Sequence, residues 1–138
     1  MDDRIVALKA VPLFGGLSDK DLGMVIEIAK EVVHEEDRPV VEEDASGVGF
    51  HLILEGMAEV NVHGEVVATF RPGDYFGEMS IIDGKPRSAT VTAAGGPVTT
   101  LAIPAWSFET LMNKHPSIMR ALLTQLSSRV RAAESPRS

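Results

Sequence analysis

Apolar side chains near the N-terminus recur at the spacing of a helix. Between residues 18 and 33 they return every three or four positions, which predicts a helix with one buried face. Its apolar positions are Leu22, Val25, Ile26, Ala29 and Val33. Ser18, followed three residues later by Asp21, is typical of a capped helix start, with Leu17 and Leu22 at the positions of a hydrophobic staple. A shorter helix is expected ahead of it, ending before Pro12.

From about residue 32 to residue 103 the pattern changes to short β-rich runs separated by glycine and aspartate. The runs cover residues 40–41, 50–54, 57–62, 66–70, 89–92 and 98–103. Ala58, Val60 and Val62 alternate with polar residues, which predicts a strand with one buried face and one solvent-exposed face. His63-Gly64 suits a tight hairpin turn. Short strands at regular spacing favour a sandwich or a jelly-roll barrel.

The last third of the chain is again helical in its pattern. Pro104 suits the first position of a short helix, and Pro116 opens a longer one that runs to about Glu134. The longer helix carries a heptad-like stripe made of Met119, Leu123, Leu126, Val130 and Ala133. This stripe predicts packing onto the strands, and self-association into a homodimer through the same helix stays open beside it.

Composition and charge narrow the class of protein. The chain has 138 residues, 44% of them hydrophobic and 24% charged, which is ordinary for one globular domain. It has no cysteine, so disulfides, thiolate metal sites and cysteine nucleophiles are excluded. The acidic N-terminus does not resemble a signal peptide and no apolar run is long enough for a membrane span, so a soluble, cytoplasmic protein is expected. A net charge of −7 disfavours DNA binding.

Four histidines, His34, His51, His63 and His115, are the first candidates for metal ligands. Their spacing is not that of a metal site, so we interpret them as surface or satisfied strand histidines and expect no metal. The acidic runs 35–37 and 42–44 are interpreted as solvated loops. A metal-dependent, cupin-like barrel enzyme is therefore a weaker alternative.

The segment from Arg71 to Val91 carries the chemistry. Gly77 permits a close approach of the backbone, and the helix-compatible run from Glu78 to Ile82 follows with amide groups able to bind an anion. After a turn stiffened by Pro86, Arg87 begins a new run and can bind a phosphate through two parallel hydrogen bonds. A carboxylate beside that phosphate suits a sugar hydroxyl. These residues predict a site for a phosphorylated sugar or a nucleotide.

Two pieces of this segment resemble a known family. Phe76-Gly77-Glu78-Met79-Ser80 and Pro86-Arg87-Ser88-Ala89-Thr90-Val91 are similar to the phosphate-binding cassette of cyclic-nucleotide-binding domains, the family of the catabolite activator protein and of protein kinase A regulatory subunits. The resemblance covers nearly the whole chain. It implies an α+β, mainly β fold: an eight-stranded jelly-roll β-barrel flanked by N-terminal helices and a C-terminal helix. The single domain, 1–138, would divide into helices (1–33), barrel (34–103, cassette 76–91), helices (104–134) and tail (135–138).

The resemblance also implies roles for individual residues. Glu78 would accept the ribose 2′-hydroxyl, and Arg87 would pair with the cyclic phosphate, helped by Ser88 and by the amides of Ser80 and Ala89. Val60 and Val62 would contact the purine, which residues 133 and 134 would cap. The implied ligand-binding set is Gly77, Glu78, Met79, Ser80, Pro86, Arg87, Ser88, Ala89, Val60 and Val62.

The function implied is that of a stand-alone sensor or regulatory module, not an enzyme. It would bind cAMP, with cGMP as the alternative, without any other cofactor, and would move its C-terminal helix to act on an unknown protein effector. The chain is too short for a DNA-binding domain after that helix, so neither DNA nor membrane is an expected partner. A barrel that has lost its ligand and serves as a protein-interaction module is the second reading.

Overall fold

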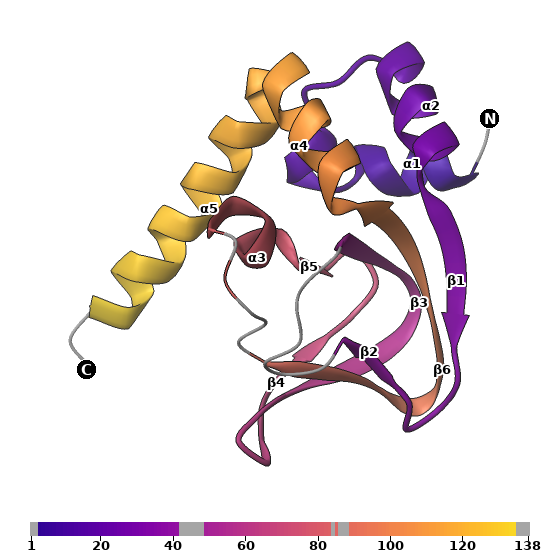
Figure 1. Cartoon of the computed structure of the whole chain (residues 1–138), viewed down its shortest axis with the longest axis vertical. Helices are drawn as coiled ribbons and strands as arrows, with labels where there is room; N and C mark the ends of the chain where they lie inside the picture. Colours follow the sequence, from indigo (N-terminus) through magenta and orange to yellow (C-terminus); the bar gives the residue numbers. More distant parts are fainter. Residues whose placement is uncertain (1–2, 42–48, 84, 86–88, 135–138) are drawn as a thin grey trace.

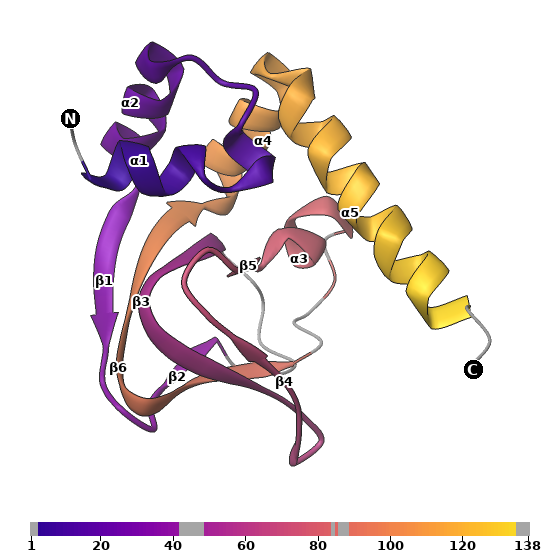
Figure 2. The same cartoon turned by 180° about the vertical axis from the view of Figure 1, so that it is seen from behind.

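The computed structural model describes residues 3–41, 49–83, 85 and 89–134 (Figure 1). A strongly curved antiparallel sheet forms the body of the molecule, and helices from both ends of the chain gather at one end of it. Figure 2 shows from behind how the last helix, α5 (Pro116–Glu134), runs away from this helical end along one side of the sheet. None of the helices in the described ranges is long and apolar enough to cross a membrane.

The N-terminal part folds into α1 (Asp3–Lys9), the short 3-10 helix η1 (Pro12–Phe14) and α2 (Asp19–Ile28). The hydroxyl of Ser18 accepts a hydrogen bond of 3.1 Å from the amide of Asp21, which confirms the predicted start of α2. The predicted end is wrong, because Val33 lies in strand β1 (Lys30–His34) instead of on the helix. Two adjacent valines, Val32 and Val33, favour a strand, and here they pair with β6 (Thr90–Pro104). The strands therefore start earlier than the boundary expected at residue 34.

Six strands are present in the described ranges, all paired antiparallel. Besides β1 they are β2 (Pro39–Val41), β3 (Gly49–Val62), β4 (Glu65–Phe70), β5 (Tyr75–Phe76) and β6 (Thr90–Pro104). The order is β1-β6-β3-β4, while β2 pairs with β6 and β5 with β3. The mainly β class is confirmed. The eight-stranded jelly-roll barrel is not, because among these residues the strand order does not close on itself.

Glycines within the long strands explain part of this difference. Residues 50–54 and 57–62, expected as two strands, are one strand bent at Gly56, whose φ is 87°. The expected runs 89–92 and 98–103 likewise belong, from Thr90 onward, to the single strand β6, which passes through Gly95 and Gly96, both with positive φ. These glycines let the chain bend without leaving the sheet, so they do not mark strand ends. The His63-Gly64 turn is confirmed between β3 and β4, with φ of 52° and 85°.

Three helices follow the strands or interrupt them. α3 (Glu78–Asp83) lies between β5 and β6, while α4 (Ala105–Lys114) and α5 (Pro116–Glu134) end the chain. The predicted bounds of α5 are confirmed. Pro104 was predicted as the first residue of the helix α4, but it is the N-cap that precedes the helix, with an extended ψ of 149°.

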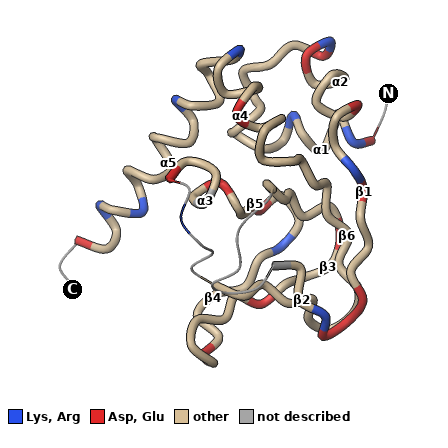
Figure 3. The backbone as a smooth tube through the Cα atoms, in the orientation of Figure 1, with Lys and Arg blue, Asp and Glu red and all other residues tan. Residues whose placement is uncertain are grey.

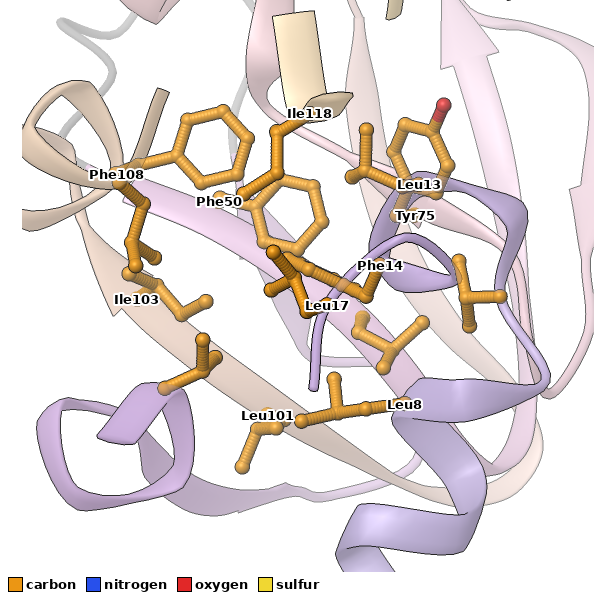
Figure 4. Close-up of a cluster of buried hydrophobic side chains, with 14 of the residues drawn as sticks. Leu8, Leu13, Phe14, Leu17, Phe50, Tyr75, Leu101, Ile103, Phe108 and Ile118 are labelled. Atoms are coloured by element: carbon orange, nitrogen blue, oxygen red, sulfur yellow. The ribbon is translucent and has the colours of Figure 1, made fainter. Parts of the chain in front are cut away.

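The core consists of two clusters of buried side chains. At the helical end, Phe50 of β3 stacks on Phe108 of α4 with ring centres 4.6 Å apart and meets the edge of Phe14 of η1 at 5.9 Å (Figure 4). This cluster joins α1, η1, α2, α4 and the start of α5 to the sheet. The second cluster belongs to the strands and consists of Ile53, Ala58, Val60, Phe76, Val91, Ala93 and Val98.

Candidate functional site

The turn between β5 and α3 carries the first site residues. Gly77 has a φ of 98°, a conformation that glycine adopts without strain, and α3 begins directly after it at Glu78. Both the special backbone at Gly77 and the short helix after it are as predicted. The turn directs Glu78 into the molecule, where it is 4% exposed.

A buried carboxylate is costly unless other groups compensate its charge. The Oε1 atom of Glu78 lies 3.6 Å from the Nη1 atom of Arg129, near the end of α5. The Arg129 side chain is half-exposed, so the pair reaches from the interior to the surface. Figure 3 shows α5 passing close to α3, with several Lys and Arg positions in blue along it. The last helix and the cassette are therefore electrostatically connected.

Tyr75 belongs to the same electrostatic neighbourhood. Burial raises the pKa of Tyr75 to about 12, the carboxylate of Glu78 raises it as well, and Arg129 opposes the shift. The phenol is therefore neutral at physiological pH and keeps its hydrogen for donation. Because Tyr75 interacts electrostatically with both Glu78 and Arg129, its neutral hydroxyl group lies near the charged pair.

An apolar wall lies beside the cassette. Val60 of β3 is buried in the same cluster as Phe76 and Val91, and the half-buried Ala89 packs against it. The β3–β6 ladder places Val60 opposite Val91 and Asn61 opposite Thr90, so β6 starts beside the end of β3. Val62, also predicted to contact a purine, is half-buried at the end of β3.

The structure brings some of the predicted ligand residues together and leaves others undescribed. Val60 and Ala89 lie in or against the apolar cluster that contains Phe76, the residue directly before Gly77 and Glu78. Met79 is half-exposed on α3, and Ser80 lies in the same helix. Pro86, Arg87 and Ser88 fall outside the described residues, so the arginine clamp on the phosphate stays a prediction.

Arg129 was missed by the sequence analysis. It is one of several arginines on α5, and its residue type alone does not separate it from the others. Its position in the helix is the signal that could have found it. Arg129 lies four residues before Ala133, which was expected to cap the base, so the two residues share one face of the helix. Its partner Glu78 comes from a segment distant in sequence.

A cavity of about 500 Å³ opens on one side of α5. Its walls come from η1, from the turn between β4 and β5, and from α5, and they include Leu13, Phe70, Tyr75, Gln125 and Arg129. The part of α5 beyond Leu126 is exposed along its length. The helix is thus anchored at its start by Ile118 and Leu122, while its end has few packing constraints.

The histidines occupy different settings. His34 and His51 lie on strands, His63 in the hairpin turn and His115 at the end of α4. In the part of the chain that the structure describes, no group of three or more histidine and acidic side chains could hold a metal ion.

The sequence profile of the cyclic nucleotide-binding domain matches residues 31–115 of this chain. A cAMP-dependent protein kinase regulatory subunit of Yarrowia lipolytica is 40% identical over 88 residues, which cover 62% of this chain and 24% of that protein. Because the family profile matches more than half of the chain, the protein belongs to the cyclic nucleotide-binding domain family.

Two solved structures share the fold. The catabolite activator protein of Thermus thermophilus superposes with a TM-score of 0.80 at 26% identity, over 89% of this chain and 60% of that one. The regulatory domain of Toxoplasma gondii PKA, crystallised with cAMP, superposes with a TM-score of 0.79 at 26% identity. The superposition covers 91% of this chain and 49% of that one. The chain therefore spans about a quarter of the kinase subunit and about half of these two structures.

Proposed function

We propose that this domain binds cAMP between the β5–α3 turn and the start of β6, and that α5 reports the binding. The observation that carries the proposal is the burial of Glu78 directly after the positive-φ Gly77, in a chain of the cyclic nucleotide-binding family. A carboxylate held in this way can accept a hydrogen bond from the ribose 2′-hydroxyl. Val60 and Val62 on β3 supply an apolar surface for the purine.

Arg87 is proposed to pair with the cyclic phosphate. The phosphate carries one negative charge in a partly desolvated site, where a guanidinium can form two parallel hydrogen bonds with it. Ser88 and the amides of Ser80 and Ala89 add donors. The positive charges of Arg87 and Arg129 would offset the repulsion between the phosphate and Glu78.

The response to the ligand is proposed to occur in α5. A ligand shifts a conformational equilibrium only by the difference in its affinity for the two states. Arg129 provides such a difference, because its position relative to Glu78 depends on where the end of α5 lies. Nucleotide on Glu78 would favour one position of the helix, which a protein effector could then recognise.

Titration calorimetry with cAMP tests the site, using wild type, Arg87→Ala and Lys85→Ala. Loss of the arginine leaves a desolvated phosphate without its cation, so affinity should fall by roughly 2–5 kcal/mol, or tens- to thousands-fold. Lys85, exposed beside the same segment, is the matched control for loss of one positive charge. Equal affinity of all three proteins would refute the assignment of Arg87.

Competition between cAMP and cGMP tests the choice of base. We expect cAMP to bind more tightly. A melting temperature that no cyclic nucleotide raises would instead favour a protein-interaction module without a ligand.

A further inference from the structure

Two histidines on different strands meet at one buried hydroxyl. The Nε2 atom of His34 on β1 lies 3.1 Å from Oγ1 of Thr100 on β6, and Nδ1 of His51 on β3 lies 3.3 Å from the same oxygen. Thr100 is fully buried, and the two imidazole centres are 6.2 Å apart. Because β6 lies between β1 and β3, the three side chains form a row across the sheet, here called the histidine cluster.

The hydrogen bonds of the histidine cluster limit how many protons it can take up. A hydroxyl donates one hydrogen and accepts others, while a neutral imidazole has one donor and one acceptor nitrogen. With neutral rings, or with one ring protonated, Thr100 can accept from one histidine and donate to the other. With both rings protonated, both donate, the hydroxyl hydrogen loses its acceptor within the cluster, and two positive charges face each other. Burial also lowers the pKa of His34.

The histidine cluster is joined to the cassette by stacked rings. His51 is paired with Phe76 across the β3–β5 ladder, and their rings stack with centres 5.2 Å apart and planes inclined by 13°. Phe76 stacks in turn on Phe70 at 5.4 Å. Phe76 directly precedes Gly77 and Glu78. The chain of contacts that starts at His34 on the edge strand β1 therefore reaches the candidate nucleotide site.

The surroundings on this face are mostly apolar. Lys30 pairs with Ala102, as does His51, so this exposed lysine shares the face of the histidines. The acidic Glu31 and Glu55 line a pocket with Thr99 on the opposite face of the sheet. Described neighbours on the histidine face include the apolar Val32, Ile53, Val98 and Ala102. The positive charge of Lys30 adds to the cost of a second proton.

We infer that His51 is a positioning residue for the cassette and that the histidine cluster makes nucleotide affinity depend on pH. While the cluster holds no more than one added proton, His51 keeps Phe76, and with it the Gly77 turn, in place. A second proton leaves the Thr100 hydroxyl hydrogen without an acceptor in the cluster and sets two positive charges against each other, which moves the rings apart, loosens the stack and weakens binding at Glu78. The inference rests on the proposed function, since it concerns the same site.

Calorimetric titration with cAMP from about pH 7.5 to about pH 5.5 tests the inference, because the single charge of cAMP does not change in this range. For wild type we expect Kd to rise roughly fivefold or more toward the acidic end.

Three variants separate the effect of the proton from that of the ring. His51→Phe keeps a ring on Phe76 but cannot be protonated, so its Kd should not change with pH. His51→Ala loses the stack and should bind more weakly at every pH. His63→Asn, in the hairpin turn, is the control and should keep the wild-type profile, since Asn tolerates positive φ.

A second measurement needs no nucleotide. Proton NMR of the imidazole signals should show that His34→Gln changes the titration of His51, because the two rings share one hydroxyl. Independent titration of the two rings, or the same affinity profile in wild type and His51→Phe, would overturn the inference. Failure of wild type to bind cAMP at about pH 7.5 would refute the proposed function instead, whatever the NMR titration gives.

Discussion

The guanidinium of Arg129 lies 3.6 Å from the carboxylate of Glu78, and this pair connects the end of α5 with the first residue of α3. The two residues are far apart in sequence, and the pair adds to the apolar contact by which Ile81 of α3 and Leu122 of α5 share one buried cluster. The carboxylate expected to bind the ribose is therefore also the group to which the last helix is tied. Changes at either residue should affect both ligand affinity and the position of α5.

Arg129→Gln should weaken cAMP binding and also lower the stability of the domain. The guanidinium is half-exposed and screened by solvent, but its partner Glu78 is buried and loses this cation in the variant, so the loss should exceed the roughly 0.2–1 kcal/mol of an exposed ion pair. Without the guanidinium, Glu78 repels the phosphate more strongly, and affinity should fall by roughly fivefold. Calorimetry measures the affinity, and Arg120→Gln, an exposed arginine on the same helix, is the matched control. Equal losses in the two variants would mean that only the net charge of α5 matters.

Glu78→Gln should lower the affinity for cAMP by about ten- to a hundredfold, because a hydrogen bond to a charged group contributes about 1.5–3 kcal/mol. The side chain keeps its size, so the domain should still fold. The sharper test adds 2′-deoxy-cAMP, which lacks the hydroxyl. Wild type should discriminate strongly between the two ligands and Glu78→Gln only weakly. Similar discrimination by both proteins would place the ribose contact elsewhere.

Local rules predicted the elements whose signals are local. The Ser18 cap, the His63-Gly64 turn, the short helix after Gly77 and the extent of α5 each depend on a few neighbouring residues. Strand limits were less predictable. Gly56 looked like a break between strands but is a bend inside one, because a distant segment, at Pro97, packs directly against it.

The contacts that the sequence did not reveal all join distant segments. The Glu78–Arg129 pair and the histidine cluster depend on which strands and helices become neighbours, and no residue pattern encodes that order. The short β5, formed by Tyr75 and Phe76, was missed for a different reason, since two residues give no alternation to detect. The cassette was identified because its residues are contiguous.

Gly56→Ala should destabilise the domain more than Gly64→Ala. Both glycines have nearly the same positive φ, 87° and 85°, so the backbone strain of about 1–3 kcal/mol is similar in the two variants. A Cβ at position 56 would lie 2.4 Å from the carbonyl oxygen of Pro97, whereas position 64 has open space. Urea denaturation should show the added cost at position 56. Equal losses in the two variants would mean that β3 can shift away from β6 at the bend.

We propose self-association into a homodimer through α5, the alternative that the sequence left open. Leu123 and Val130, both on the heptad-like stripe, are 67% and 54% exposed, so they are available for a contact with a second copy of the helix. Sedimentation velocity should show a dimer for wild type and a monomer for Leu123→Ser/Val130→Ser. Thr110→Ala, an exposed site on α4, should leave the dimer intact. A monomeric wild type at high concentration would contradict the prediction.

Stability should fall in acid because of His34. Burial lowers the pKa of His34 in the folded protein below its ordinary value of 6.5, so below that pH the unfolded chain binds more protons than the folded one. The contribution is fully present above 6.5 and is lost as pH falls through the lower folded-state pKa, with a slope of at most about 1.4 kcal/mol per pH unit for one proton. The carboxylates also titrate in acid, so the informative quantity is the difference in unfolding free energy between wild type and His34→Gln. That difference should shift in favour of the variant as pH drops, while His63→Asn should follow wild type. Parallel pH profiles for wild type and His34→Gln would show that His34 takes up its proton without cost to the fold.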